Sequence, residues 1–361
     1  MGTAGIPTPA AADLDAPASG EPSSTAARSP WSLVWRRLKR NRAALAGGII
    51  FLGILLMCFV GAPVAAHALG HGPDDVFPYA VSDELKPVGP WTRVPDVTTF
   101  VDVTADTPRT LLILGADGTL GRDQFLRLLY GGQVSLQIGL GAMLLSLLIG
   151  VPFGIVSGYL GGKTDWIISR GTELFMGFPL LLFLAAIVFT VGPRFGDITL
   201  RGLFQPGVLV LIVLIGAFSW FLPARIIRAQ VLSLREHEFV EAARMVGAGD
   251  GWIMRKHILP HLVAPIVVWG TLICASFIVF EAAISVLNVG VKLPTASWGN
   301  MFSANWGTLL VFDPLRAEGA YYVERSHWVV FWPSAALFLS IVSLAVFGEG
   351  LRRAIDPQGR E

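Results

Sequence analysis

Long apolar runs alternate with polar stretches along this chain. Crossing a hydrocarbon layer of about 30 Å takes roughly 20 mostly apolar residues at helical rise, so each run of that length predicts one membrane span. Six runs meet this criterion: Ala43–Ala66, Val134–Leu160, Leu174–Val191, Gly207–Ala224, Val263–Leu287 and Trp328–Gly348. The pattern therefore predicts an all-α integral membrane protein with six transmembrane helices in a lipid bilayer.

Composition agrees with this fold class and argues against others. Hydrophobic residues make up 53% of the chain and charged residues only 15%, against roughly 25% charged residues in a soluble domain. A formal net charge of +1 is too small for the broad positive surface of a nucleic-acid-binding protein. Cys58 and Cys274 both lie in apolar runs, so they predict neither a disulfide framework nor a CxxC metal site.

Lys and Arg residues predict the orientation of the chain. They are more numerous in the segments that become cytoplasmic if the amino terminus is inside, so both termini are expected in the cytoplasm. Residues 1–30 are rich in Ala, Pro, Ser and Thr and predict a disordered cytoplasmic tail. Residues 31–66 then hold a basic interfacial segment and the first span, 67–133 an extracytoplasmic loop, 134–350 a helical core, and 351–361 a cytoplasmic end. A cleavable signal peptide is disfavoured, because the first apolar run is too long.

The loop 67–133 contains two runs of β-forming residues, Thr98–Thr104 and Thr110–Leu114. Asp117 and Gly118 follow as a turn signal, so we expect a small extracytoplasmic β element between the first two spans.

The same loop offers four side chains that could be assembled into a metal site: His67, His71, Asp74 and Asp75. Polar loops collect such residues, and the spacing of these four matches no known ligand template. No metal site is therefore predicted.

Two features of the spans each leave two interpretations open. Gly150, Gly154 and Gly158 recur every four residues, which indicates close contact with another helix, either static or sliding during function. Glu281 lies deep in the fifth span, and a carboxyl group at that depth either faces a functional passage or makes a polar contact between helices.

The segment 233–260, between the fourth and fifth spans, is the most informative. It predicts two short cytoplasmic helices joined by a bend. Ser233 and Glu236 form a capping-box pattern, Asp250 is expected to cap the second helix and Pro260 to end it. Gly247 and Gly249 would permit the bend. A single apolar face is expected from four residues at helical spacing: Phe239, Ala242, Ala243 and Val246.

Small residues at the centre of an apolar face allow another protein to approach closely. A helix that lies on a membrane would instead carry bulky apolar residues and a Lys/Arg-rich opposite face. Here that opposite face holds Glu236, Glu238 and Glu241, so the pattern favours docking to a protein.

Part of this segment resembles the EAA loop of ABC importer permeases. The matching positions are Glu241, Ala242, Ala243, Gly247, Leu259 and Pro260. The family pattern is Glu-Ala-Ala, three residues, Gly, nine residues, Ile, one residue and Leu-Pro. His257 stands at the Ile position, and Ile258 supplies an apolar side chain beside it.

Three further segments, Leu120–Leu136, Pro294–Met301 and Gly348–Pro357, resemble the C-type subunits of the dipeptide, oligopeptide and nickel permease family. The likeness covers about residues 31–357. It implies the ABC type I importer architecture, in which residues 134–350 are the permease core and 233–260 the coupling loop to an ATPase. It also implies a bacterial inner-membrane protein that forms half of a pathway for di- or oligopeptides.

The sequence departs from this family mainly on the outer side. The first outer loop and the stretch Phe302–Ser326 look longer than the family norm, and Ser285–Gly290 replaces the usual Ser-Phe-Leu-Gly-Leu-Gly. These differences bear on binding-protein docking and substrate choice. Nickel chelates, glutathione or another small solute therefore remain alternatives to peptides.

The resemblance also implies partners: a homologous permease subunit, two ABC ATPase subunits and an extracytoplasmic substrate-binding protein. Gly158–Thr164 resembles a phosphate-binding loop but has one residue too few and follows a membrane span, so ATP and Mg²⁺ are expected on the ATPase subunits and no cofactor on this chain. A secondary transporter would need no such partners and would show inverted repeats, which the sequence lacks. No catalytic residue is predicted, because no paired catalytic residues recur at helical spacing within the spans.

Overall fold

The computed structural model describes residues 30–82, 86–101, 103–196, 198–200, 202–306, 311–312, 321–322 and 327–355. The tail predicted for residues 1–30 lies outside this part of the chain except for Pro30. Most of the stretch Phe302–Ser326 and of the carboxyl-terminal end 351–361 also lies outside the described residues.

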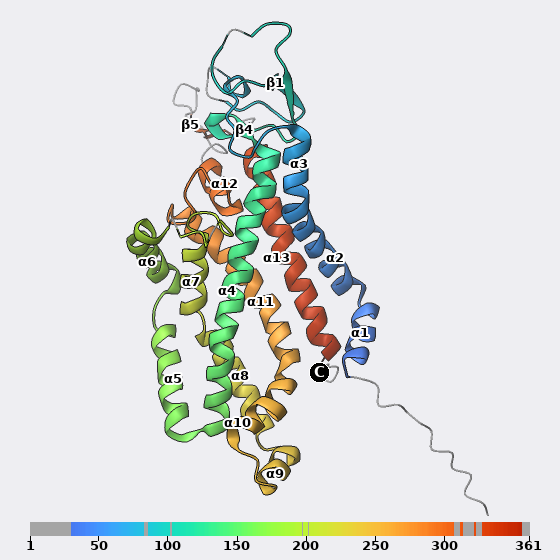
Figure 1. Ribbon diagram of the computed structural model, residues 1–361, viewed down its shortest axis with the longest axis vertical. Helices are drawn as coiled ribbons and strands as arrows, with labels where there is room; N and C mark the ends of the chain where they lie inside the picture. The colour runs from blue at the N-terminus through green and yellow to red at the C-terminus, as the bar shows by residue number, and fades with distance from the viewer. Residues whose placement is uncertain are drawn as a thin grey trace, which may run out of the picture.

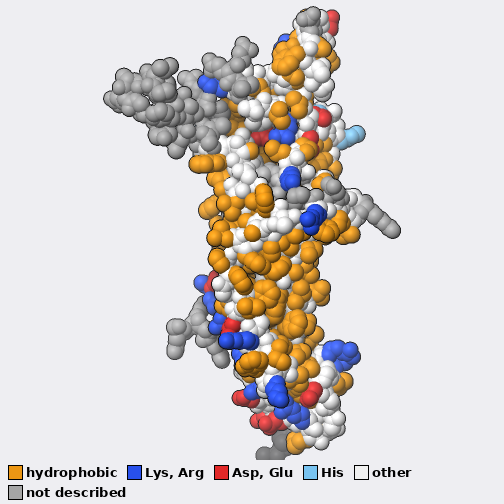
Figure 2. Space-filling model, turned by 90° about the vertical axis from the view of Figure 1, so that its left-hand side faces the viewer, with side chains coloured by type: hydrophobic (Ala, Val, Ile, Leu, Met, Phe, Trp, Pro, Cys, Tyr) orange, Lys and Arg blue, Asp and Glu red, His pale blue; other side chains and the backbone are white. Residues whose placement is uncertain are grey.

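Long helices run side by side along the longest axis of the molecule (Figure 1). Within the described residues, five are long and apolar enough to cross a membrane: Arg42–Leu69, Gln124–Leu160, Val208–Leu234, Asp250–Val286 and Trp328–Ile355. Hydrophobic side chains dominate the middle of the face shown in Figure 2, while many of its charged side chains gather toward the lower end. The middle of this face thus presents the apolar surface that contact with a lipid bilayer requires.

Several of these spans consist of more than one segment. The first contains α2 (Arg42–Leu56), a π-helical turn (Met57–Gly61) and α3 (Ala62–Leu69), and it follows the basic helix α1 (Pro30–Arg40). The second span is the single helix α4 (Gln124–Leu160). The third consists of α7 (Val208–Phe218) and α8 (Phe221–Leu234). The fourth consists of α10 (Asp250–Ile253), a π-helical turn (Met254–Ile258) and α11 (Leu259–Val286). The last is α13 (Trp328–Ile355).

The apolar run predicted as a third span, Leu174–Val191, is not one straight helix. It is shared between α5 (Gly162–Met176) and α6 (Leu180–Phe195), whose axes differ by 81° at the break between them. Pro179 lies at this break and restricts the residue before it, which explains why the helix stops there. The predicted number of six spans is reached when this bent pair is counted as one.

Helix α4 begins ten residues before the predicted start of its span, because Asp123 caps its amino terminus. The Asp123 carboxylate accepts hydrogen bonds from the backbone N–H groups of Phe125 and Leu126, at 2.7 and 3.1 Å. The helix is central to the fold and contacts α5, α7, α8 and α11. Its glycine stripe is closely packed: a Cβ atom at Gly150 would lie 2.5 Å from the carbonyl oxygen of Trp220, the N-cap residue of α8, and one at Gly154 would lie 2.6 Å from that of Ala224 in α8.

Small β elements lie at one end of the molecule, opposite to the carboxyl end of α13 (Figure 1). Strands β1 (Thr92–Pro95) and β2 (Arg109–Leu112) are antiparallel, as are β3 (Ala116–Asp117) with β4 (Arg122–Asp123) and β5 (Val311–Phe312) with β6 (Tyr321–Tyr322). The run predicted at Thr98–Thr104 is not a strand; the partner of β2 is β1. β-propensity identifies residues that suit a sheet, but the pairing partner depends on register and turns.

The short helix α12 (Trp298–Asn305) lies near this same end and packs against α11 and α13. Its amino terminus has a complete capping box. Ser297 accepts from the backbone of Asn300, and the Asn300 side chain accepts from the backbone of Ser297.

Candidate functional site

The predicted coupling loop forms the end of the molecule opposite to the β elements (Figure 1). Helix α9 (Glu238–Met245) is followed by a bend and then by α10. Val240 and Ala243 are buried on the inner side of α9, in an apolar cluster with Val231 of α8 and Ile253 of α10. Burial of this face holds α9 against the ends of the membrane-spanning helices.

Gly247 makes the bend through its backbone conformation. Its φ angle is +81°, which is unfavourable for residues with a Cβ atom. The N–H of Gly247 donates to the Arg244 carbonyl at 2.9 Å, and the N–H of Ala248 donates to the Ala243 carbonyl at 3.0 Å. These two bonds form a Schellman motif that ends α9. Space is not the constraint, since a Cβ atom at Gly247 would have no neighbour within 4 Å.

The opposite side of the coupling loop exposes apolar side chains to solvent. Met245 and Val246 are 83% and 85% exposed, and Ala242 and half-exposed Trp252 add to this surface. Glu241 is also exposed, so an apolar tip is flanked by an acidic side chain. A surface of this kind outside the membrane is typical of a protein contact.

Three polar contacts attach the coupling loop to the end of α4. The Tyr159 hydroxyl donates to the Asp250 carboxylate at 3.0 Å. Arg244 donates to that hydroxyl at 3.3 Å, and its guanidinium lies over the Tyr159 ring, 5.1 Å from the centroid. Arg235 donates to the Gly158 carbonyl at 3.1 Å. Movement of α9 and α10 is therefore linked directly to α4.

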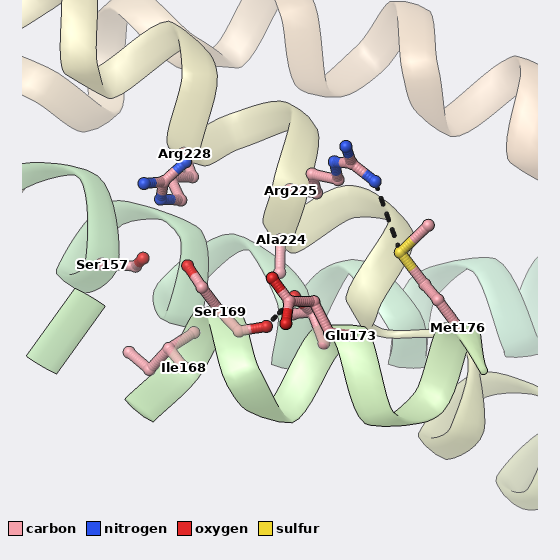
Figure 3. A pocket seen from close by; sticks show the side chains of 9 residues that line it. Ser157, Ile168, Ser169, Glu173, Met176, Ala224, Arg225 and Arg228 are labelled. Atoms are coloured by element: carbon pink, nitrogen blue, oxygen red, sulfur yellow. Dashed lines mark hydrogen bonds between the residues drawn. The ribbon is translucent and has the colours of Figure 1, made fainter. Parts of the chain in front are cut away.

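A cavity of about 230 Å³ lies beside this attachment, between α5 and α8 (Figure 3). Arg225 and Arg228 enter it from α8, and Ser169 and Glu173 from α5. Arg225 approaches the Met176 sulfur at 3.4 Å, as the dashed line in Figure 3 shows.

Asp165 of α5 connects three helices next to this cavity. Its carboxylate accepts from Ser157 of α4 at 2.5 Å and from Ser169 at 3.1 Å. It also receives two bonds from the Arg228 guanidinium, at 2.5 and 2.7 Å. Such a two-point contact between guanidinium and carboxylate fixes geometry as well as distance. Asp165 thus links α4, α5 and α8.

Glu281 is fully buried in α11, away from the coupling loop. Its carboxylate accepts hydrogen bonds from Ser135 of α4 at 2.9 Å, from Ser285 at 2.9 Å and from Ser297 at 2.8 Å. Ser297 is the residue that caps α12. A single carboxylate thus joins α4, α11 and the start of α12.

The outer loop is fixed by a second polar cluster around Arg127 of α4, whose side chain is 1% exposed. Arg127 contacts Asp117 at 2.5 Å and Asp74 at 2.8 Å, and it donates to the Pro294 carbonyl at 3.1 Å. The other Asp117 oxygen accepts from Asn305 of α12 at 2.9 Å. These contacts attach the loop between the first two spans to both α4 and α12.

Three of the four side chains considered for a metal site have other partners: Asp74 binds Arg127, as described above. His71 lies 3.0 Å from the Asp123 carboxylate, and Asp75 accepts from the backbone of Gly72. Within the described part of the chain, no group of three or more His, Cys, Asp or Glu residues could hold a metal ion. Burial by itself lowers the pKa of His71, but the hydrogen bond and charge of Asp123 outweigh it and raise the pKa above the ordinary value.

Several details predicted for the coupling loop are wrong. Ser233 and Glu236 form no capping box, because α8 continues to Leu234 and α9 begins at Glu238 after the N-cap residue His237. The Ser233 carbonyl lies 3.0 Å from Nδ1 of His237 instead. Asp250 is not the N-cap of α10; Gly249 is, and the Asp250 carboxylate binds Tyr159.

Pro260 does not separate α10 from the fifth span. The helix passes through it, because the π-helical turn Met254–Ile258 widens the chain just before Pro260 and accommodates the missing N–H. The predicted apolar face is also divided: Ala243 is buried and Phe239 half-buried, while Ala242 and Val246 are exposed.

Sequence reasoning missed Tyr159, which attaches the coupling loop to α4, and the pair Asp165 and Arg228, which joins α5 to α8. No local pattern marks these residues, because their partners are distant in the sequence. Asp165 and Arg228 lie 63 positions apart. The imperfect phosphate-loop pattern Gly158–Thr164 is the turn between α4 and α5, and a helix rather than a strand precedes it.

Comparison with known proteins relates this geometry to a family. Residues 29–87 match the N-terminal transmembrane domain of oligopeptide transport permease C. The chain is 31% identical to the oligopeptide transport system permease protein OppC of Haemophilus influenzae, over 92% of this chain and 90% of that protein. It is 32% identical to the dipeptide transport system permease protein DppC of Bacillus subtilis, over 90% and 85%.

It is also 30% identical to the di/tripeptide transport system permease protein DppC of Pseudomonas aeruginosa, over 91% of this chain and 93% of that protein. The family model for the inner membrane component of binding-protein-dependent transport systems matches residues 150–360. This range includes the coupling loop, Asp165 and Glu281. The chain therefore belongs to the family of inner membrane components of binding-protein-dependent transport systems, and it is a multi-pass membrane permease.

Proposed function

We propose that this chain is one of two homologous permease subunits of an ATP-driven importer for short peptides, and that it forms half of the translocation pathway. The names of its relatives support the substrate class, since they transport oligopeptides, dipeptides or di- and tripeptides. In this proposal ATP and Mg²⁺ bind two separate ATPase subunits, and an extracytoplasmic binding protein delivers the peptide. The amino and carboxyl termini are cytoplasmic.

The single observation that carries the proposal is the coupling loop. Its apolar tip is exposed while its inner side is buried and attached to α4 through Tyr159. We assign ATPase coupling to the matched positions Glu241, Ala242, Ala243, Gly247, Leu259 and Pro260. Ala242 offers a small exposed side chain that allows close approach, and Gly247 sets the angle at which α9 is presented.

Force from the ATPases would pass from α9 to α4 and then to α5 and α8 through Asp165. Nucleotide at the inner end and loaded binding protein at the outer end would each favour one of two conformations of the helices. Such a device needs a stiff connection, and the charged, two-point Arg228–Asp165 contact supplies one.

The partner permease would cover the exposed side of the bent pair α5 and α6. Large apolar residues on this pair are exposed in the isolated chain: Trp166, Ile167, Leu174, Leu182 and Phe189. Lipid covers such residues on the outside of a membrane protein. The 81° bend, however, leaves α6 without a straight path across the bilayer, which favours a protein neighbour.

Glu281 has a supporting role in this proposal. The sequence left two interpretations, a residue of the pathway or a polar contact between helices. Its complete burial and its three serine donors favour the second. We propose that Glu281 does not contact the peptide but supports the pathway indirectly, because its carboxylate holds the start of α12 in place.

Reconstitution tests the proposed function. The chain would be purified with its permease partner and ATPases, placed in liposomes, and supplied with its binding protein and tritium-labelled Ala-Ala-Ala. Uptake that requires ATP, the binding protein and all subunits is the expected result. Peptide accumulation by this chain alone without nucleotide would overturn the proposal, as would failure of the whole complex to take up peptide.

A further inference from the structure

A second cavity, distant from the coupling loop, lies near the outer end of α4. Its volume is about 190 Å³. Its polar lining comes from four parts of the chain: the first outer loop, α4, the segment that precedes α7 and the segment that precedes α12. The polar lining residues are Asp74, Tyr130, Gln133, Gln137, Gln205 and Thr295.

Two amide side chains of α4 line this cavity. Gln133 and Gln137 are four residues apart on α4, so they lie on one face in successive turns. Gln133 uses its amide N–H to bind the Cys58 carbonyl at 2.7 Å. The Gln137 carbonyl oxygen is buried and has no hydrogen-bond partner among the described residues. A buried acceptor without a donor is unfavourable, so a ligand that brings an N–H group would be stabilised here.

Asp74 adds a negative charge at the rim. One of its carboxylate oxygens contacts Arg127 at 2.8 Å, while its side chain remains 47% exposed. A carboxylate has about four acceptor positions, so Asp74 can accept further hydrogen bonds. Asp74 and Gln137 therefore both present acceptor oxygens at the cavity, and a ligand with N–H donors fits these two groups.

We propose that this outer cavity is a binding subsite for the amino-terminal end of a peptide in transit. This rests on the proposed function. Asp74 receives the terminal ammonium group, and Gln137 accepts from the first backbone N–H. A ligand of drug size occupies about 300–1,000 Å³, so this smaller cavity holds one end of a peptide and leaves the rest free to vary. That geometry would let one permease carry peptides of different lengths.

Photo-crosslinking in the complete complex tests the subsite. A benzophenone amino acid replaces Leu203, an exposed residue that lines the cavity, and in a control protein Leu148, which is as exposed on α4 but does not line it. Both complexes receive tritium-labelled Ala-Ala-Ala from the binding protein during ATP turnover. We expect label at Leu203, suppressed by excess unlabelled peptide, and background label at Leu148.

Two further variants separate binding from folding. Asp74→Asn and Gln137→Leu should lower the crosslinking yield about tenfold, the effect expected for one hydrogen bond to a charged or buried group. Asp75→Asn is the matched control, because Asp75 binds only the backbone of Gly72 in its own loop. Co-purification of the partner permease and the ATPases checks that each variant complex is assembled, and the crosslinking yield is compared among assembled complexes only.

The outcomes distinguish this inference from the proposed function. Wild-type complex that imports the peptide while Leu203 acquires no label overturns the subsite alone. Crosslinks from Leu203 to the partner permease in place of the peptide would assign the cavity to the subunit interface and overturn it as well. A wild-type complex that imports no peptide refutes the proposed function, and the subsite with it.

Discussion

The Tyr159 hydroxyl donates a 3.0 Å hydrogen bond to the Asp250 carboxylate, which joins the last turn of α4 to the first turn of α10. Arg244 of α9 binds the same hydroxyl. One side chain therefore contacts both helices of the coupling loop. This contact is one direct connection between the coupling loop and α4.

Replacing Tyr159 with Phe should weaken this connection while keeping the ring under Arg244. Removing one hydrogen bond to a charged group costs about 1.5–3 kcal/mol. We expect ATPase activity in the reconstituted complex to respond less to loaded binding protein, and uptake per ATP to fall. Tyr79→Phe is the control, since its hydroxyl binds the Val101 carbonyl in the outer loop. Equal effects of the two variants would count against the route through Tyr159.

Gly247→Val should disrupt the bend of the coupling loop. The left-handed conformation costs a residue with a Cβ atom about 1–2 kcal/mol, and a β-branched side chain raises that cost. We expect loss of transport and weaker co-purification of the ATPases, with normal membrane insertion. Gly249→Val is the control, because Gly249 has φ −73° and ψ 153°, which Val adopts readily. Normal uptake and ATPase co-purification in Gly247→Val would refute the coupling assignment.

Glu281→Ala should destabilise the complex, because three buried serine hydroxyls lose their acceptor. Each orphaned group costs about 1–3 kcal/mol. Glu281→Gln, which keeps one acceptor oxygen, should have a smaller effect, and Ser276→Ala on the exposed side of α11 almost none. Thermal unfolding of the purified complex measures all three. If Glu281→Gln changes the KM for peptide while stability is unaltered, Glu281 lines the pathway after all; an unchanged uptake rate supports the interhelix role.

The outer loop should become less stable as pH rises. Asp123 raises the pKa of His71 in the folded loop above its ordinary value of 6.5, so the loop binds this proton more tightly than the unfolded chain does. The resulting stabilisation is complete below pH 6.5 and is lost as pH rises through the folded pKa. Hydrogen-exchange protection factors of residues 70–123, in which the intrinsic pH dependence of exchange is divided out, should therefore be lower at pH 8 than at pH 6. His71→Gln should remove this difference, whereas His67→Gln, at an exposed site, should retain it.

The sequence predicted the helical fold and the place of the coupling loop, because both depend on local patterns. Runs of apolar residues report length directly, and Glu241 to Gly247 keep their family spacing. Boundaries at proline were harder to predict. Pro260 looks like a helix end, but the π-helical turn before it allows the helix to continue, and Pro63 follows the π-helical turn Met57–Gly61 in the same way.

The polar contacts that connect elements could not be predicted from local patterns. Asp117 gives no sign that it binds Arg127 and Asn305, the second of which lies 188 positions away. Nor does α9 reveal which of its apolar sides is buried, because apolar residues occur in adjacent pairs around it. Tertiary structure decides both, since only the folded chain brings the partners together.

The close packing along the glycine stripe of α4 provides a fixed reference distance for measurements during the transport cycle. With no side chains between them, the backbones of α4 and α8 approach so closely that a Cβ atom at Gly158 would lie 2.8 Å from the Arg228 carbonyl. Spin labels placed on these two helices, at exposed Leu148 and Leu222, should therefore keep one separation throughout turnover. Distances from a third label on α6 to these two labels would then measure movement of α6 relative to α4 and α8. Because rotation of the whole subunit leaves these distances unchanged, any change in them would report displacement of the bent helix itself.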